Sequence, residues 1–308
     1  MKTIKKLIKF LISNKFFLNF YKGKRYIFLF HDVSNENDLQ HSEIYSTNIK
    51  YFEKNIKLIN DLFKIIPLNS LVKDRLSDNK NYASITFDDG FLSVLENAYP
   101  ILKKLNIPFT IFVNGEAISN NQLWVSNIII NKDSNYKERL INLARLNKNN
   151  INPIEEIYTN GIFNEEFCAQ YKIKSKSKKI YLDYNDLIFL TNNSVSIASH
   201  SFHHLVLSRC DKELLVNEII KNKNIVDSIN DNNIDHFAIP FGKENHYNEN
   251  VLNVLNNYGY KYIYTTKPSY FNKSCLNNKS YLFPRITVTN QKPKELMYNI
   301  IRPIFFKE

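Results

Sequence analysis

The sequence predicts an α/β protein built as an irregular, incomplete (β/α) barrel of about seven strands. Short apolar runs rich in β-forming residues recur along the 308 residues, and most are separated by segments with apolar residues at three- and four-residue spacing. Such alternation of strands and helices is typical of parallel α/β folds. Apolar residues make up 44% of the chain and charged residues 23%, which argues against a disordered chain and against a protein with many membrane spans.

Each predicted element is assigned from the spacing of its apolar residues, which differs between strands and helices. The runs predicted as strands are Ile27–Phe30, Lys64–Leu68, Ala83–Phe87, Phe109–Val113, Val195–Ala198, Phe237–Ile239, Tyr262–Thr265 and Ile286–Val288. The segments predicted as helices between them are Phe52–Phe63, Val94–Leu105, Lys212–Ile229 and Asn250–Tyr258. These elements form one predicted domain over residues 25–308.

Residues 1–24 are predicted to form a basic amphipathic helix. Ile4, Leu7, Ile8 and Leu11 recur at helical spacing, with lysines on the other face. Polar residues break this apolar run, so it cannot span a bilayer, and no small-residue cleavage site follows it. The helix can lie on an anionic membrane surface or pack on the bottom of the barrel, and the sequence leaves both open. The absence of an export signal predicts a cytoplasmic protein, peripheral at the inner membrane if the first placement holds.

Residues 114–193 do not follow the alternation of strands and helices and are predicted to be an insertion between two strands. They are rich in Asn and Lys, with helical patterns at Tyr136–Leu146 and Asp183–Leu190. The net charge of +11 comes mostly from scattered lysines, so we expect no nucleic-acid partner. The three cysteines are far apart and form no C-x-x-C pair, which predicts neither a zinc ribbon nor a disulfide framework.

Two adjacent carboxylates, Asp88 and Asp89, follow a predicted strand and precede Gly90. The chain has only six glycines, so a glycine here indicates a tight turn that a side chain would obstruct. Carboxylates this close repel each other unless a proton or a cation lies between them. A lone Asp-Gly pair would be explained as a helix cap, so a second motif has to decide.

That second motif is a histidine pair, His200 and His204, which also follows an apolar run. The four-residue spacing puts two imidazoles on one side of a helical turn, whereas His203 points elsewhere. Two imidazoles and one carboxylate form a three-ligand set with an open position, as a hydrolytic Zn²⁺ site requires. The two motifs together therefore predict a catalytic metal site.

These motifs resemble those of the polysaccharide deacetylases, with the nodulation-type chitooligosaccharide deacetylase domain of carbohydrate esterase family 4. The similar segments are Thr86–Gly90, His200–His204, Phe237–Gly242 and Phe283–Ile286, and the resemblance covers roughly Tyr26 to Val288. It implies a TIM-like barrel in which Asp88 is the general base. It also implies a divalent metal, expected to be Zn²⁺, bound by Asp89, His200 and His204.

The chain differs from most of this family in its candidate for the general acid. In most members, a histidine near the C-terminus is the general acid. No histidine follows His246 here. A circularly permuted branch that includes exopolysaccharide deacetylases carries the acid in an early Tyr-His-Asp-like motif, and Phe28–Val33 resembles that motif. The resemblance is closest to that branch and implies His31 as the acid. The alternative is that His31 and Asp32 only cap a loop.

Two further assignments concern charge at the reacting centre. Arg285 is expected beside Asp88, in place of an arginine that the family often carries where this chain has Ala238, although a purely structural ion pair is an alternative. Phe241 and Gly242 are expected to contact substrate and to supply a backbone N–H to the oxyanion.

The expected activity is hydrolysis of the N-acetyl group of an acetylhexosamine in a glycan or a lipid-linked saccharide, with release of acetate. Carbohydrate is then the expected partner. One alternative is a deformylase of a lipid-linked amino sugar, which would use the same site on a smaller acyl group. Another is an inactive glycan-binding homologue, against which the complete Asp-Asp-His-His set argues.

Overall fold

A computed structural model describes residues 22–38, 42, 45–73, 76–123, 178–230, 235–271 and 281–305. The described residues form one nine-stranded sheet with strand order β8-β7-β6-β5-β4-β3-β1-β9, while β2 pairs beside β3, and every neighbouring pair of strands is parallel. The strands are β1 (Arg25–Phe30), β2 (Lys64–Ile65), β3 (Tyr82–Phe87), β4 (Phe109–Val113), β5 (Ser196–Ser199), β6 (His236–Ala238), β7 (Tyr262–Tyr264), β8 (Tyr281–Phe283) and β9 (Ile286–Thr287).

The two edges of the sheet are joined through the chain itself. β8 pairs with β7, whereas β9 pairs with β1 at the other edge, and only Pro284 and Arg285 separate β8 from β9. Proline has no N–H to donate to a neighbouring strand. Pro284 therefore ends the hydrogen bonding of β8 to β7 before β9 begins to pair with β1. The sheet is therefore curled into an irregular barrel whose closing segment carries Arg285.

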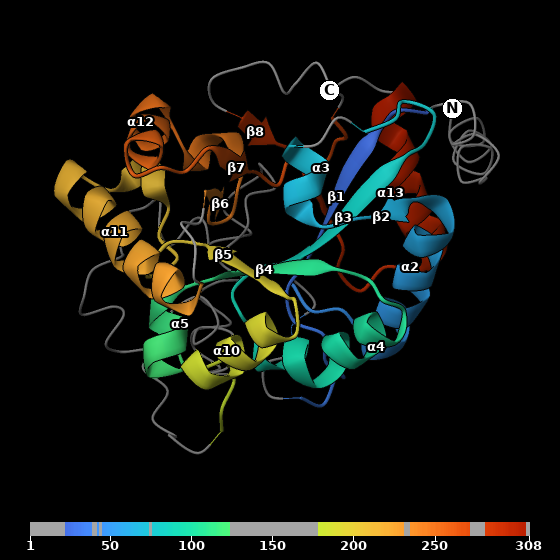
Figure 1. Ribbon diagram of the computed structural model, residues 1–308, viewed down its shortest axis with the longest axis horizontal. Helices are drawn as coiled ribbons and strands as arrows, with labels where there is room; N and C mark the ends of the chain where they lie inside the picture. The colour runs from blue at the N-terminus through green and yellow to red at the C-terminus, as the bar shows by residue number, and fades with distance from the viewer. Residues whose placement is uncertain are drawn as a thin grey trace, which may run out of the picture.

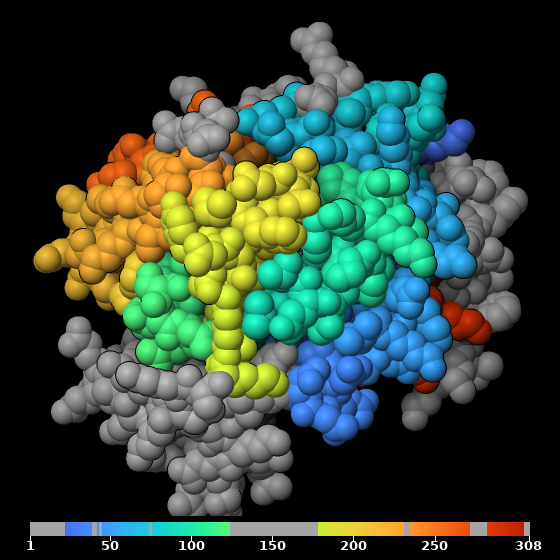
Figure 2. Space-filling view, turned by 60° about the horizontal axis from the view of Figure 1, so that its bottom comes forward, coloured from blue at the N-terminus to red at the C-terminus, as the bar shows by residue number. Residues whose placement is uncertain are grey.

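Helices cover the outside of the curled sheet (Figure 1). Several begin at a side chain that accepts a hydrogen bond from the first turn: Asn48 for α2, Asp183 for α10, Asp211 for α11 and Asn248 for α12. In Figure 2, α10 and α11 lie side by side on the surface, in agreement with their contacts. The helices are α2 (Ile49–Leu62), α3 (Leu68–Lys73), α4 (Tyr99–Lys104), α5 (Gly115–Asn120), α10 (Tyr184–Asn192), α11 (Lys212–Ile229), α12 (Glu249–Asn257) and α13 (Pro293–Phe305), with shorter turns η2 (Val94–Ala98), η3 (Leu207–Arg209) and η4 (Glu244–His246).

The strands β1, β3 and β4 are buried along their whole length, as parallel strands covered on both faces must be. Along β1, Phe28 and Phe30 belong to the core that packs against α2, whereas Ile27 belongs to a second cluster. That second cluster contains residues of β4, β5, β6, β7 and β8 and fills the interior of the barrel. Side chains alternate between the two cores because successive strand residues point to opposite faces.

The structure confirms the predicted strand and helix order, with local differences. All eight predicted strand runs contain a strand, but the second ends at Ile65, because Pro67 and the helix α3 follow. The described strands number nine rather than about seven, and β8 is the one that lies outside every predicted run. The sequence patterns also did not predict α3, α5 or α13.

Three sequence-based predictions fall wholly or partly outside the described residues. The N-terminal helix and the helix at Tyr136–Leu146 lie there, as does the middle of the predicted insertion at residues 114–193. The described ends of that insertion contain α5 and α10, and its flanking strands β4 and β5 still pair with each other. No helix in the described part of the chain is long and apolar enough to cross a membrane.

Candidate active site

The structure brings the predicted site residues to one end of the barrel. Because the strands are parallel, their C-terminal ends share one edge, which is where catalytic groups gather in barrels of this type. The predicted residues at these ends are His31 after β1, Asp88 and Asp89 after β3, His200 after β5, Phe241 after β6 and Arg285 after β8.

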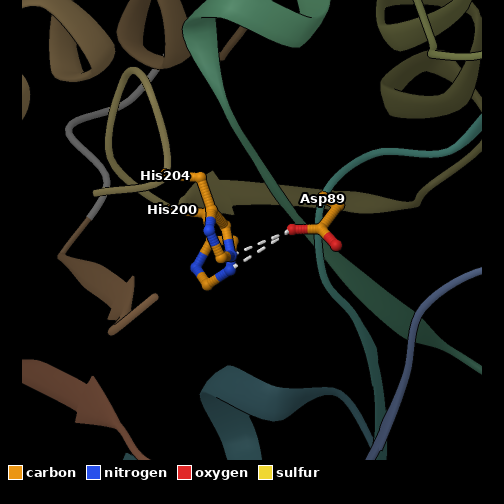
Figure 3. A group of neighbouring side chains, drawn as sticks. All are labelled: Asp89, His200 and His204. Atoms are coloured by element: carbon orange, nitrogen blue, oxygen red, sulfur yellow. Dashed lines mark ion pairs between the residues drawn. The ribbon is translucent and has the colours of Figure 1, made fainter. Parts of the chain in front are cut away.

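Asp89, His200 and His204 form one buried cluster (Figure 3). The Oδ1 atom of Asp89 lies 3.4 Å from Nε2 of His204 and 3.6 Å from Nε2 of His200. One possible ligand atom from each residue lies within 4.8 Å of the other two. Two ligands at about 2.1 Å from a tetrahedral ion are about 3.4 Å apart, so this spacing fits a single divalent cation.

Hydrogen bonding around the cluster leaves the facing atoms of His200 and Asp89 available to a cation. The Nδ1 atom of His200 donates to the Ala238 carbonyl at 2.8 Å, so Nε2 carries the lone pair that faces Asp89. The Oδ1 atom of Asp89 is buried and accepts no hydrogen bond within the described part of the chain. A buried carboxylate oxygen without a donor is costly, and a cation would compensate it. The residues present therefore fit a divalent metal.

The electrostatics of the three residues favour the same conclusion. Burial lowers the pKa of His200 and of His204, and the neighbouring His200 lowers the pKa of His204 further. Both rings are therefore neutral, which is the form that binds a metal. Burial raises the pKa of Asp89 well above its usual value, and the charge of Asp88 adds to the rise. A cation beside Asp89 would reverse that rise.

The turn that presents the two imidazoles is not helical, so the interpretation of their spacing as a helical turn is wrong. His200 directly follows β5, and Ser201 and His204 both have left-handed backbone conformations, with φ of 65° and 60°. The Ser201 Oγ accepts a hydrogen bond from the His204 N–H at 3.1 Å. This compact turn brings the ring centroids of His200 and His204 to 4.9 Å.

Asp88 forms a bidentate ion pair with Arg285. The two guanidinium nitrogens donate to Oδ1 and Oδ2 at 2.8 and 2.7 Å, and both side chains are buried, at 2% and 0% exposure. Arg285 Nε also donates to the Thr265 carbonyl, which fixes the plane of the guanidinium. Burial alone would raise the pKa of Asp88, but the charges of Arg285 and His200 and the hydrogen bonds from Arg285 lower it to about 2. Asp88 is therefore held ionised, with Oδ2 3.7 Å from Nε2 of His200.

His31 lies within electrostatic range of Asp88 but outside the three-residue cluster. Burial lowers the pKa of His31 to about 4; the charge of Asp88 opposes this effect, and Arg285 and His200 add to it. Its Nδ1 is buried and has no hydrogen-bond partner among the described residues. The adjacent Asp32 accepts hydrogen bonds from the hydroxyl groups of Ser34 and Ser93, which ties the loop after β1 to the segment after β3.

Phe241 forms one wall of the site, and Gly242 follows it in the same turn. The Phe241 ring meets the His204 ring edge-on, with centroids 4.6 Å apart. Both residues have left-handed φ values, 60° and 68°, and non-glycine residues keep this conformation only where the surrounding structure enforces it. The Gly242 N–H donates to the Pro240 carbonyl at 2.7 Å, so this N–H is already engaged. The structure therefore gives no free Gly242 N–H for the expected oxyanion contact.

Sequence reasoning missed the residues that hold the metal-ligand turn, residues 200–204, which carries two of the candidate ligands. Asn114 follows β4 directly, and its Nδ2 donates to the carbonyls of His200 and Ser201 at 2.5 and 3.0 Å. Its place at the end of a strand could have identified it. Glu218 of α11 accepts a hydrogen bond from the His203 N–H at 2.8 Å, and nothing in its helical pattern distinguished it. The His203 ring contacts Glu218 and stays outside the cluster.

Comparison with known proteins identifies the family. The family model of the polysaccharide deacetylases matches residues 75–162 and 167–263, which is more than half of the chain. The chain belongs to the polysaccharide deacetylase family. The matched span contains the Asp89, His200 and His204 cluster of this family member, whereas His31 and Arg285 lie outside the match.

Individual relatives agree with this membership. YxkH of Bacillus subtilis (strain 168), a polysaccharide deacetylase homologue, is 22% identical over 247 residues, or 79% of this chain, and the match spans 64% of that protein, less than two thirds of its length. The Streptococcus pyogenes deacetylase PplD, solved in complex with acetate, has a TM-score of 0.61 at 16% identity, covering 91% of this chain and 99% of its own. IcaB from Ammonifex degensii has a TM-score of 0.57 at 13% identity, covering 89% and 96%. These structures confirm the predicted irregular barrel.

Proposed function

We propose that this polysaccharide deacetylase family member is a metal-dependent carbohydrate N-deacetylase. Its reaction would add water across the amide C–N bond of an acetylhexosamine in a glycan or a lipid-linked saccharide, giving acetate and a free amine. The observation that carries the proposal is the buried Asp89, His200 and His204 cluster, with ionised Asp88 beside it at the C-terminal end of the barrel. The acetate bound to PplD supports the acyl group chosen here.

Asp89, His200 and His204 are the residues that would hold the metal. Two imidazoles and one carboxylate are a donor set that suits Zn²⁺, and three protein ligands leave a position open. When bound, the ion supplies Lewis-acid activation of water and of the acyl carbonyl.

Asp88 would accept the proton of the attacking water. Its carboxylate is ionised and is kept in one orientation by two hydrogen bonds from Arg285, so Arg285 acts through Asp88 as a positioning residue. Charge developing on the carbonyl oxygen would be stabilised by the backbone N–H of Phe241, whose ring lies against His204.

His31 would donate a proton to the departing amine. We assign this role by its position near Asp88, after the first strand. With a pKa of about 4 the ring is neutral at pH 7, so it would first have to take up a proton from solvent before it could donate one to the amine. Negative charge developing on the substrate would raise the pKa of His31 and favour this uptake.

The experiment that tests the metal and base assignments compares three variants of the full chain. Asp88→Asn is expected to keep bound metal but lose about 10²- to 10⁴-fold in kcat, because only the proton acceptor is removed. His204→Ala is expected to lose both metal and turnover. Asp61→Asn makes the same chemical change at an exposed carboxylate in α2 and should behave as wild type. Metal content by mass spectrometry and acetate release from acetylhexosamine oligosaccharides are the readouts, and full turnover in Asp88→Asn would refute the mechanism.

The acyl group is tested with matched N-acetyl and N-formyl forms of one amino sugar, free and lipid-linked. Faster release of acetate supports the deacetylase, whereas formate release alone would favour the deformylase predicted as an alternative. Binding of both sugars with neither reaction would indicate the inactive homologue.

A further inference from the structure

Glu218 is a buried carboxylate that belongs neither to the Asp89, His200 and His204 cluster nor to the residues proposed to transfer protons. It lies in the middle of α11 and is 1% exposed. A carboxylate is rarely buried unless its oxygens are paired, because desolvation of the charge is costly. Its partners are therefore informative.

Both oxygens of Glu218 contact one residue of the metal-ligand turn. Oε2 accepts a hydrogen bond from the His203 N–H at 2.8 Å, and Oε1 lies 2.5 Å from Nδ1 of the same residue. His203 lies between Ser201 and His204, the two residues with left-handed φ. The side chain of Glu218 thus holds the residue that lies between the two unfavourable backbone conformations of the turn.

The rest of the turn is held by contacts that a change at residue 218 would leave in place. Asn114 binds the carbonyls of His200 and Ser201. The Phe202 N–H donates to the backbone carbonyl of Glu218 at 3.1 Å, and the Phe202 carbonyl accepts from the Glu116 N–H at 3.0 Å. Variants at position 218 therefore isolate the contribution of the carboxylate.

We propose that Glu218 is a positioning residue of the metal site. Its carboxylate holds residues 200–204 in the conformation that directs both imidazoles at Asp89 before a metal arrives. The inference rests on the proposed function, because it assigns the cluster to a metal. Removal of a side chain that orients the ligands of a metal commonly weakens the affinity of the protein for that metal about 10- to 100-fold.

The test is a titration of the metal-free full chain with Zn²⁺, in wild type, Glu218→Ala, Glu218→Met and Glu218→Gln. Both Ala and Met remove the acceptor, and Met keeps most of the volume, so it preserves the fold if the Ala variant does not fold. We expect the Zn²⁺ dissociation constant to rise about 10- to 100-fold in these two variants. Gln keeps an oxygen for the His203 N–H and should recover part of the loss.

A matched control separates positioning from stability. Asn55 is also a buried polar residue in a helix, and its side chain donates to the Gln291 carbonyl at 2.9 Å. Asn55→Ala should lower the melting temperature of the metal-free protein while leaving the Zn²⁺ dissociation constant unchanged. The visible spectrum of bound Co²⁺ should change in Glu218→Met but not in Asn55→Ala, because it reports the geometry of the ligands.

Two results would overturn the assignments, and they differ. Wild-type Zn²⁺ affinity and an unchanged Co²⁺ spectrum in folded Glu218→Met would refute the positioning role alone. Failure of the wild-type chain to bind Zn²⁺ or Co²⁺ at all would instead refute the proposed function.

Discussion

At the scale of single residues, two carboxylates that are adjacent in sequence have opposite electrostatics. Arg285 and its hydrogen bonds lower the pKa of Asp88 to about 2 against the effect of burial, whereas burial and the charge of Asp88 raise the pKa of Asp89. Neighbouring titratable groups whose environments separate their pKa values are typical of sites in which each has its own role. Here the separation fits a base and a metal ligand.

The Asp88 and Arg285 pair gives a prediction about stability. Arg285→Met should lower the free energy of unfolding of the metal-free protein by about 3–5 kcal/mol, because it leaves a buried carboxylate without its partner. Urea denaturation measures this loss. Lys267→Met is the matched control, since the Lys267 and Glu244 pair is 53% and 76% exposed and such pairs contribute less than about 1 kcal/mol. Equal losses in the two variants would contradict the prediction.

At the scale of elements, the turns after the strands fix the site through backbone conformations that side chains disfavour. Gly242 has φ +68°, and a Cβ there would lie 2.7 Å from the Thr266 backbone N. The turn therefore needs glycine both for its conformation and for its close approach to the loop after β7.

Gly242→Ala should therefore destabilise the protein and reduce turnover, because the Phe241 wall has to move. Gly259→Ala is the control: its φ is +88°, but nothing lies within 4 Å of a Cβ there. The control should lose about 1–2 kcal/mol from the unfavourable φ alone and keep its activity. Thermal melts and acetate release distinguish the two variants, and equal melting temperatures with full activity in both would refute the argument.

At the scale of the whole molecule, the site depends on closure of the sheet. The partners Asp88 and Arg285 are 197 residues apart in sequence, and Arg285 reaches Asp88 because β8 and β9 join the two edges of the barrel. The three proposed metal ligands come from the ends of two strands that β4 separates. Metal binding should therefore be coupled to folding, since the unfolded chain does not assemble these groups.

Zn²⁺ at 100 times its dissociation constant should raise the free energy of unfolding by about 2.7 kcal/mol in wild type. Removal of the ion with a chelator should reverse the gain. Calorimetric melts with and without Zn²⁺ measure the effect, and His204→Ala should show none at the same concentration. A wild-type melting temperature that does not change when Zn²⁺ is added would contradict the proposed site.

The sequence by itself determined the order of most strands and helices and the identity of the clustered residues. Apolar period and burial are local properties, so runs such as Ala83–Phe87 could be identified as strands without knowledge of their neighbours. Asp88, Asp89 and His200 could then be placed at one edge, because parallel strands end together. The strand β8 was not predicted from the sequence, whereas β6 and β7, which have the same length, were.

Only the tertiary structure decided how these residues meet. The spacing of His200 and His204 fits a helix as well as the left-handed turn that is found, and the difference is set by contacts from Asn114 and Glu218 on other elements. The pairing of Arg285 with Asp88 likewise depends on where the sheet closes. Such contacts join distant parts of the chain, and the free energy that selects them comes from packing and desolvation, which no local pattern records.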